Sequence, residues 1–411
     1  MVRLIVILTL LKLNLMIKLI IWLEGTVACL LLAACHPSSV GLKKTICEIE
    51  QVFVSADTLF LQARSGFLPN NKRIVTTSIY GFGAHAYGDL YALKYENNQW
   101  GKPELIKNLQ RHKFQEGMLR TFGDVTPDWH VKSGTLLCTG KSFYFYLEDT
   151  KWKESKDKRA DIEHLQDVAY AVYKPLTDEW SEMKVLDLPQ KLDNGDDFYC
   201  VNAGCTQRYD LPDGDILLPI RYLKGANYVS TVIRCSYDGE ELKYIKHGSV
   251  FTVPQPRGLY EPSITYYNGI YFLTLRGDKT AYVATSKDGL HYGSLVEWKF
   301  NDGSWLGSYN TQQHWISHSS GLYLVYTRMG ADNDQVFRHR APLFMAKVDV
   351  GKLCVLKETE CVLLPIPPEN GDLGNFGVTH IGPDETWVTA SSLPQRGRAS
   401  NIQIAKIYWK H

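Results

Sequence analysis

The chain has 411 residues, of which 45% are hydrophobic and 22% charged, so it is long and apolar enough to bury a large core. Lys and Arg (45) balance Asp and Glu (44) to a formal net charge of +1, which argues against a nucleic-acid-binding protein. Aromatic residues make up 12% and glycine is frequent, a composition that favours short strands and turns over helical bundles.

Residues 1–35 have the composition of an export signal. An apolar stretch interrupted by three charged residues ends in Leu32-Ala33-Ala34-Cys35, and the interruptions disfavour a membrane-spanning helix. A cysteine after Leu-Ala-Ala resembles the lipobox of bacterial lipoproteins, in which this cysteine is acylated. We therefore predict an exported protein of the cell envelope, periplasm or medium, attached to a membrane only through a possible lipid on Cys35. An uncleaved anchor is the alternative.

Seven cysteines follow Cys35, and this odd, thinly spread set is not typical of a disulfide framework. Cys354 and Cys361 could face each other across a tight hairpin, and they are the one pair for which we consider a disulfide. Buried reduced cysteines are the alternative. No Cys or His spacing is typical of a structural zinc site, so we expect no metal and no cofactor.

The rest of the chain repeats one pattern of paired short strands. Residues 261–276 (EPSITYYNGIYFLTLR) place Asn268-Gly269 between two apolar runs, which is a strong signal of a β-hairpin. This turn sets Tyr267 opposite Ile270, and the same register predicts Glu261 opposite Arg276. Similar hairpins are predicted at residues 126–141, 206–221, 313–328 and 376–392.

Each hairpin is followed by a third strand-like run. The six runs of this kind are residues 89–95, 168–174, 229–236, 281–286, 343–349 and 402–408. Two of them lead directly into Ser-x-Asp-Gly turns, at residues 236–239 and 286–289. We interpret the charged stretch 151–163 as a solvated excursion between strands.

Sheets of three or four strands cannot bury both faces alone, but sheets stacked radially can. We therefore predict an all-β fold, a six-bladed β-propeller formed by a single domain over residues 45–411. Residues 47–54 are expected to add a closing strand to the last blade. A seven-bladed propeller is the alternative, because residues 55–95 are hard to divide into strands.

In a propeller, the start of the first strand and the end of the second strand of every blade emerge on one face, which we call the mouth. The hairpin registers therefore place Lys141, Arg221, Arg276 and Arg328 at equivalent positions around the mouth, with Gln313 opposite Arg328. Cations gathered at one site need anions, and arginine binds carboxylates through two hydrogen bonds. These residues are thus predicted to bind an acidic ligand.

Other side chains predicted at or near the mouth can transfer protons or donate hydrogen bonds. They are His85, Asp124, Tyr260, Glu261, His314, His339 and Arg340. For each arginine the alternative is packing against a neighbouring blade or pairing with a blade acid. For each histidine it is a structural hydrogen bond.

The repeats, the stretch Tyr260-Glu261-Pro262 through Arg276 and the Ser-x-Asp-Gly turns resemble the sialidase superfamily of six-bladed propellers. The resemblance implies that Glu261 supports the nucleophile and that Arg276 and Arg328 belong to the arginine triad that binds the substrate carboxylate. It also implies that the turns are shortened Asp boxes with a structural role. The chain lacks the Phe-Arg-Ile-Pro motif of the family's first triad arginine, and Tyr408 is the first tyrosine after Arg328.

We therefore predict an exported, sialidase-like glycoside hydrolase that acts on an acidic sugar. In this hypothesis Glu261 is base or nucleophile partner, Asp124 is the acid, and the arginines clamp the carboxylate. Two alternatives stay open, a propeller polysaccharide lyase in which Tyr or His moves the proton of a uronate, and a non-catalytic glycan-binding lipoprotein. The expected partner is an acidic oligosaccharide or polysaccharide, with no nucleic acid, and the expected state is a monomer.

Overall fold

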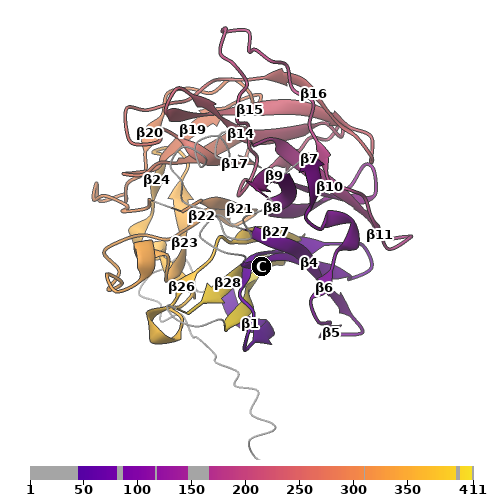
Figure 1. The fold of residues 1–411 in the computed structure, drawn as a ribbon. Coiled ribbons are helices and arrows are strands. Elements are labelled where there is room, and N and C mark those ends of the chain that lie inside the picture. The colour runs from indigo at the N-terminus through magenta and orange to yellow at the C-terminus, as the bar shows by residue number, and fades with distance from the viewer. Residues whose placement is uncertain are drawn as a thin grey trace, which may run out of the picture. The chain divides into compact units, whose positions relative to one another are not determined.

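Six antiparallel sheets make up the part of the chain that the computed structural model describes, which is residues 45–80, 87–115, 118–146, 166–309, 311–394 and 399–409. Figure 1 shows these sheets arranged in a ring, around which the chain runs in sequence order. Residues 1–35, the predicted signal, lie outside the described residues, as does the charged stretch 151–163. No helix among the described residues has the length and hydropathy needed to cross a membrane.

Each sheet is one blade. Blade 1 comprises β2 (Phe60–Phe67), β3 (Arg73–Tyr80), β4 (Tyr87–Glu96), β5 (Gln99–Trp100) and β6 (Glu104–Leu105). Blade 2 comprises β8 (Met118–His130), β9 (Thr135–Tyr146), β10 (Val168–Lys174), β11 (Glu179–Trp180) and β12 (Lys184–Val185), with β7 (His112–Gln115) beside β8. Blade 3 comprises β13 (Tyr209–Asp210), β14 (Ile216–Lys224), β15 (Asn227–Tyr237) and β16 (Leu242–His247).

The second half of the ring has the same organisation. Blade 4 comprises β17 (Tyr260–Tyr267), β18 (Ile270–Arg276), β19 (Tyr282–Ser286) and β20 (Val296–Glu297). Blade 5 comprises β21 (His314–His318), β22 (Gly321–Tyr326), β23 (Leu343–Asp349), β24 (Cys354–Val355) and β25 (Cys361–Leu364). Blade 6 comprises β26 (Asp372–Leu373), β27 (Gly377–Gly382), β28 (Glu385–Leu393), β29 (Ser400–Trp409) and β1 (Thr45–Ser55). The described 3-10 helices are η1 (Lys107–Leu109), η2 (Phe337–His339), η3 (Lys357–Thr359) and η4 (Pro368–Asn370).

The prediction of an all-β, six-bladed propeller is confirmed, and the seven-bladed alternative is wrong. β1 pairs antiparallel with β29, so the amino-terminal strand closes the last blade as predicted. The six predicted third strands are β4, β10, β15, β19, β23 and β29. Residues 55–95 contain β2, β3 and most of β4, and the β2–β3 hairpin turns at Asn70 and Asn71, which have positive φ angles.

The hydrophobic core is divided among the junctions between blades. Among the described residues, six buried apolar clusters occur, and each draws its side chains from two neighbouring blades. Ile74 of blade 1 packs with Leu136 of blade 2, and Trp387 of blade 6 packs with Phe60 of blade 1. Because every blade buries one face against each neighbour, the ring is stable only when it closes. The inner strands β8, β17, β21 and β27 are thereby held around the centre (Figure 1).

The cysteines after Cys35 are all free thiols, so the disulfide considered between Cys354 and Cys361 does not form. Cys354 in β24 pairs with Asp349 of β23, and Cys361 in β25 pairs with Met345 of the same strand. The two cysteines thus belong to consecutive segments along one edge of β23. They are not the two arms of a hairpin, which is why they do not face each other.

Candidate functional site

The inner strands share an irregularity near the mouth. In blades 1, 2 and 4 the register with the second strand shifts at a β-bulge that contains Gln62, Asp124 or Glu261. These three residues have φ angles of 57°, 53° and 48°, and Cys205, which precedes β13 in blade 3, has 59°. A bulged residue leaves the ladder, so its side chain is re-aimed. Gln62 Oε1, for example, accepts a hydrogen bond of 2.9 Å from the backbone N–H of Asp124 in the next blade.

Asp124 and Lys141 form a buried ion pair in blade 2. Lys141 Nζ lies 2.5 Å from Asp124 Oδ2. Burial disfavours the charged form of Asp124, yet Lys141 and Arg64 outweigh burial, and the pKa of the Asp124 carboxyl lies below its ordinary value. Gly204 of blade 3 approaches this pair so closely that a Cβ there would lie 2.6 Å from Asp124 Cβ. Asp124 is therefore a carboxylate held in its charged form.

Glu261 and Arg276 form a second ion pair, in blade 4. Arg276 donates through Nη1 to Glu261 Oε2, and its guanidinium lies 4.6 Å from the ring centroid of Tyr260. The Tyr260 hydroxyl donates to Asp278, and it accepts a hydrogen bond of 2.8 Å from Arg257. Burial raises the pKa of the Tyr260 phenol above its ordinary value. Tyr260, predicted as a catalytic residue, is placed here as a platform for Arg276.

A β-bulge in the first strand changes the pairing of this hairpin from the predicted register. The turn at Asn268-Gly269 and the pairing of Tyr267 with Ile270 are confirmed. The bulge then places Arg276 opposite Tyr260 instead of Glu261. The predicted ion pair still forms, because the bulged Glu261 lies beside the end of β18.

Arg221 is stacked within the same region. Its guanidinium lies 3.8 Å from the ring centroid of Tyr228, and the Tyr228 and Tyr260 centroids are 5.5 Å apart. Arg221 thus lies over the Tyr228 ring and Arg276 over the Tyr260 ring, and the two tyrosines contact each other edge to face. Arg221 Nη2 donates to Gln166 Oε1 at 2.8 Å, while Nη1 is buried and has no hydrogen-bond partner among the described residues. The Arg221 side chain also interacts with Cys200, and a buried guanidinium N–H without a hydrogen-bond partner among the described residues is a donor that a ligand can use.

Arg64 is a fully buried cation that the sequence did not reveal. From blade 1 it donates to the carbonyls of Phe376 (3.2 Å) and Val125 (3.2 Å) and to Cys205 Sγ (3.1 Å), so it connects blades 6, 2 and 3. Gly377 leaves room for its side chain, because a Cβ there would lie 2.8 Å from Arg64 Cγ. An arginine thus does occupy the first inner strand, although Gln-Ala-Arg-Ser does not match the family motif. The Asn70-Asn71 turn after this strand was the missed signal.

Arg340 joins these residues from the long loop before β23. It interacts electrostatically with Arg276, Glu261 and Asp372, and burial, followed by repulsion from Arg276, lowers its pKa. The charged residues brought together at the mouth, which we call the central cluster, are Arg64, Asp124, Lys141, Arg221, Glu261, Arg276 and Arg340.

Arg328 does not join the central cluster, so its predicted place at the mouth is wrong. The predicted two-residue loop at residues 320–321 lies at residues 319–320. This displacement shifts the pairing by two residues, so Gln313 no longer lies opposite Arg328, and β22 ends at Tyr326, before Arg328. Arg328 instead donates two hydrogen bonds to Glu360, at 2.8 and 2.6 Å, and lies 4.8 Å from the Phe344 ring centroid.

Gln313 and His339 also have structural partners. Gln313 is buried, accepts a hydrogen bond of 2.7 Å from Thr274 Oγ1 and donates one of 2.6 Å to Ser308 Oγ. His339 Nδ1 lies 2.6 Å from the Tyr309 hydroxyl, and Nε2 lies 3.2 Å from Asp334 Oδ1. His85 lies outside the described residues.

His314 is a buried structural histidine. Its Nε2 donates to the Phe376 carbonyl at 3.2 Å, so Nδ1 is the acceptor for Ser263 Oγ at 2.9 Å. Burial, together with the nearby charge of Arg64, lowers its pKa from 6.5 to about 3. A neutral imidazole with both nitrogens in use does not suit proton transfer at neutral pH.

The lowered pKa predicts how His314 affects stability in acid. Between pH 6.5 and 3 the unfolded chain binds a proton at this residue that the folded chain does not bind, so acidification favours unfolding. The expected contribution is about 1.4 kcal/mol per pH unit within this window. In urea titrations at pH 4 to 6, His314→Gln should therefore show a shallower dependence of the unfolding free energy on pH. Equal slopes for His314→Gln and the parent protein would contradict the lowered pKa of His314.

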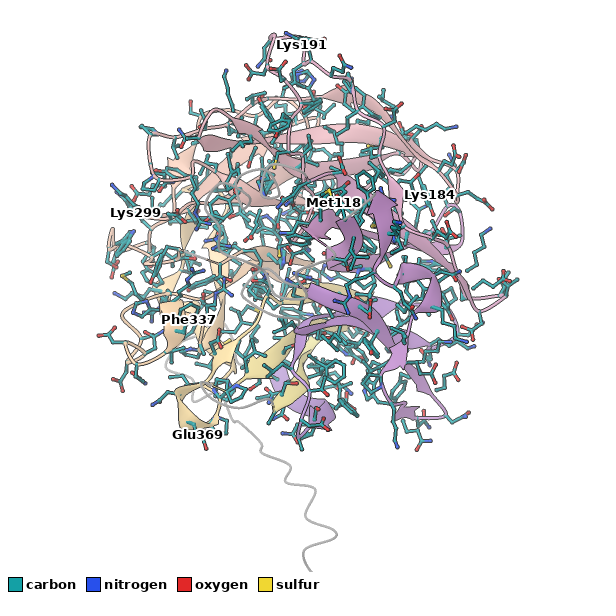
Figure 2. All side chains as sticks on the ribbon, in the orientation of Figure 1. Met118, Lys184, Lys191, Lys299, Phe337 and Glu369 are labelled. Atoms are coloured by element: carbon teal, nitrogen blue, oxygen red, sulfur yellow. The ribbon has the colours of Figure 1, made fainter. Side chains whose placement is uncertain are left out.

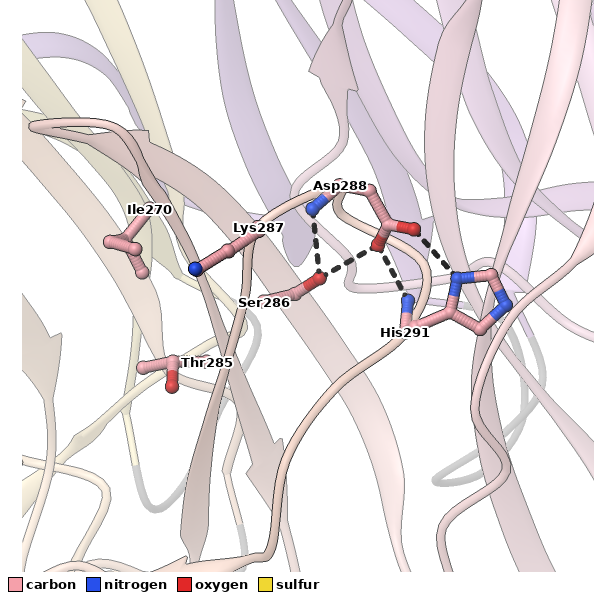
Figure 3. Close-up of a pocket in the computed structure, with 6 residues that line it drawn as sticks. All are labelled: Ile270, Thr285, Ser286, Lys287, Asp288 and His291. Carbon is pink, nitrogen blue, oxygen red and sulfur yellow. Dashed lines mark hydrogen bonds and ion pairs between the residues drawn. The ribbon is translucent and has the colours of Figure 1, made fainter.

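The Ser-x-Asp-Gly turns lie between third and fourth strands, at the opposite ends of the strands from the mouth. Figure 3 shows the turn after β19, where Asp288 Oδ1 accepts hydrogen bonds from Ser286 Oγ (2.9 Å) and the His291 backbone N–H (2.8 Å). His291 Nδ1 lies 2.6 Å from Asp288 Oδ2. A cavity of about 460 Å³ adjoins this turn. Because the carboxylate is occupied by the turn itself, its role is structural.

No protein-family model and no protein of curated function matches the sequence. Among solved structures, a protein of unknown function from Dyadobacter fermentans matches with a TM-score of 0.60 and 13% identity, over 88% of this chain and 99% of that chain. Trypanosoma rangeli sialidase matches with a TM-score of 0.58 and 12% identity over 85% of this chain, which spans about half (55%) of the sialidase. An α-L-arabinofuranosidase from Fusarium graminearum matches with a TM-score of 0.52 and 12% identity, over 87% and 98% of the two chains. At these identities the likeness concerns the fold, and the described chain has the six-bladed propeller fold of the sialidases.

Proposed function

We propose that this protein is a glycoside hydrolase whose central cluster binds the carboxylate of an acidic sugar. The observation that carries the proposal is the buried Nη1 of Arg221 within a group of five cations, of which Lys141 pairs with Asp124, Arg276 pairs with Glu261, and Arg340 interacts with Glu261 and Asp372. Buried charges are costly without partners of opposite sign. A ligand carboxylate would supply negative charge and accept a hydrogen bond from the unpartnered Nη1 of Arg221.

Two carboxylates are the usual requirement for glycoside hydrolysis. Asp124 and Glu261 come from blades 2 and 4, and both interact electrostatically with Cys205 of the blade between them. We assign Glu261 to accept a proton from the attacking water while the water oxygen bonds to the anomeric carbon. The glycosidic bond breaks, and the departing oxygen takes a proton from solvent. Asp124, whose pKa is lowered, suits stabilisation of positive charge at the anomeric carbon better than the acid role expected from the sequence.

The described side chains favour hydrolysis over lyase chemistry. A lyase needs a Tyr or His free to remove the proton beside the substrate carboxylate. The Tyr260 hydroxyl is engaged by Asp278 and Arg257, and both nitrogens of His314 are hydrogen-bonded. Asp124 and Glu261 are ion-paired through Oδ2 and Oε2, and Asp124 Oδ1 has no hydrogen-bond partner among the described residues, which favours the two-carboxylate mechanism.

A substrate screen tests the proposal. The purified protein is incubated with sialylated and uronate-terminated oligosaccharides, and with the same compounds as carboxyl methyl esters. We expect new reducing ends from at least one acid and no rise in ultraviolet absorbance. Its methyl ester should react at least about 100-fold more slowly, because it leaves buried arginine donors unpaired.

Each other outcome of the screen contradicts a part of the proposal. A rise in ultraviolet absorbance would indicate the unsaturated product of a lyase. Saturable binding of an acidic glycan without any product would indicate a binding protein. Equal rates on acid and ester would show that the arginines do not recognise a carboxylate.

A further inference from the structure

A second pocket lies apart from the central cluster, on the outer part of blade 4. It has a volume of about 340 Å³, and its lining includes Trp305, Tyr282, Gln255, Lys279 and Glu297. Trp305 is 47% exposed, although it is a large apolar side chain. It pairs across a short turn with Lys299, which Figure 2 labels at the edge of the molecule.

The Trp305 ring is held in place by its turn. Phe300 donates its backbone N–H to Ser304 at 2.9 Å, and Asp302 Oδ1 accepts a hydrogen bond of 2.9 Å from the Ser304 N–H. The indole Nε1–H is directed at Thr280 Oγ1, 3.4 Å away. An exposed aromatic ring on a rigid turn is a preorganised surface that loses little conformational entropy when a ligand covers it.

The polar side chains of this pocket are balanced in charge, in contrast to the central cluster. Lys279 carries one positive charge, and Glu297, which pairs with Tyr282 between β20 and β19, carries one negative charge. Gln255 Oε1 accepts a hydrogen bond of 3.0 Å from the Lys279 backbone N–H. Such a set offers both donors and acceptors without a net charge, which fits a neutral ligand rich in hydroxyl groups.

We propose that this pocket binds a neutral sugar unit of a glycan, with the apolar face of the sugar ring on Trp305. The hydroxyl groups at the ring edge are then within reach of Gln255, Lys279 and Glu297. A pyranose ring presents both surfaces, an apolar C–H face and a polar edge.

The loop between β18 and β19 connects the pocket with the central cluster. Asp278 accepts hydrogen bonds from Arg257 and Tyr260 on the side of the cluster, and the next residue, Lys279, lines the pocket. A glycan with an acidic end at the cluster would therefore extend toward the pocket through neutral units. This extension rests on the proposed function, whereas binding of the neutral sugar alone does not.

Saturation-transfer NMR with lactose and N,N′-diacetylchitobiose tests the pocket directly. We expect transfer to the ring C–H protons of at least one disaccharide, a weaker signal for Trp305→Phe and loss of the signal for Trp305→Ala. The matched control is Phe337→Ala, which removes an aromatic side chain that is 59% exposed in η2 and should leave the signal unchanged. Thermal unfolding of each variant confirms that it is folded.

The NMR experiment also distinguishes failure of the sugar-binding pocket from failure of the proposed hydrolase. Arg221→Ala should keep transfer to the neutral disaccharide and lose recognition of acidic glycans. If neither disaccharide receives transfer, or if Trp305→Ala retains it, the pocket does not bind sugars, whatever the outcome of the substrate screen. If the disaccharide binds and no acidic glycan is cleaved, only the proposed hydrolase is wrong.

Discussion

Glu261→Gln is expected to abolish glycan hydrolysis, with turnover falling between about 10²- and 10⁴-fold. The amide keeps the size of the side chain, but it cannot take a proton from water and it removes the charge that faces Arg276. Initial rates of reducing-end formation on the acidic oligosaccharide measure the effect. The KM for that substrate should change little, because the arginines that bind the carboxylate remain.

Glu360→Gln is the matched control for this experiment. Glu360 also pairs with an arginine, Arg328, but the pair lies away from the central cluster. We expect this variant to keep the hydrolytic rate while losing stability. Equal rates for Glu261→Gln and the parent protein would remove Glu261 from the mechanism and favour a binding protein.

Arg328→Ala is expected to lower the free energy of unfolding by about 3–5 kcal/mol without affecting ligand recognition. Glu360 accepts two hydrogen bonds from Arg328 and one from the Tyr326 hydroxyl, and its side chain is only 13% exposed. Removing the cation leaves this carboxylate largely buried with only a neutral hydrogen-bond donor. The loss of the guanidinium over the Phe344 ring adds to the effect.

Urea unfolding of variants tests this expectation. Arg234→Ala serves as a comparison, since its partners Asp213 and Asp215 are more exposed and the pair should contribute at most about 1 kcal/mol. The double variant Arg328→Ala/Glu360→Leu should recover part of the loss, because it no longer leaves a buried charge unpaired. If Arg328→Ala bound acidic glycans more weakly and its stability were unchanged, Arg328 would be a ligand-binding residue and not a structural one.

Local sequence signals were sufficient for the blades. Short apolar runs rich in β-branched and aromatic residues, bounded by turn residues, predict strands. Asn268-Gly269 determines its hairpin because both residues adopt positive φ angles, as a tight turn of this kind requires. Such signals depend on neighbours in the sequence, and for this reason the third strands and the closing strand β1 could be predicted from the sequence.

The composition of the central cluster could be predicted only in part. Lys141, Arg221 and Arg276 lie in second strands as predicted, although only Arg276 ends its strand, and Glu261, Asp124 and Arg340 join them. The sequence did not show that Arg64 belongs there, since its strand precedes a turn without glycine. It also did not show that Tyr260 and His314 form hydrogen bonds with residues of other segments, Asp278 and Phe376. Because of these bonds, neither side chain is free to transfer a proton.

The sequence by itself determined that this chain is a ring of six antiparallel sheets, because apolar strand runs and turn residues are local properties. Only the tertiary structure decided which charges meet at the mouth. A bulge at Glu261 changes the direction of a side chain, and a turn displaced by one residue before Arg328 changes which residues are paired, both without changing the strand pattern. Packing of each blade against its neighbours determines where the bulge and the turn form. That packing involves residues hundreds of positions apart in the sequence.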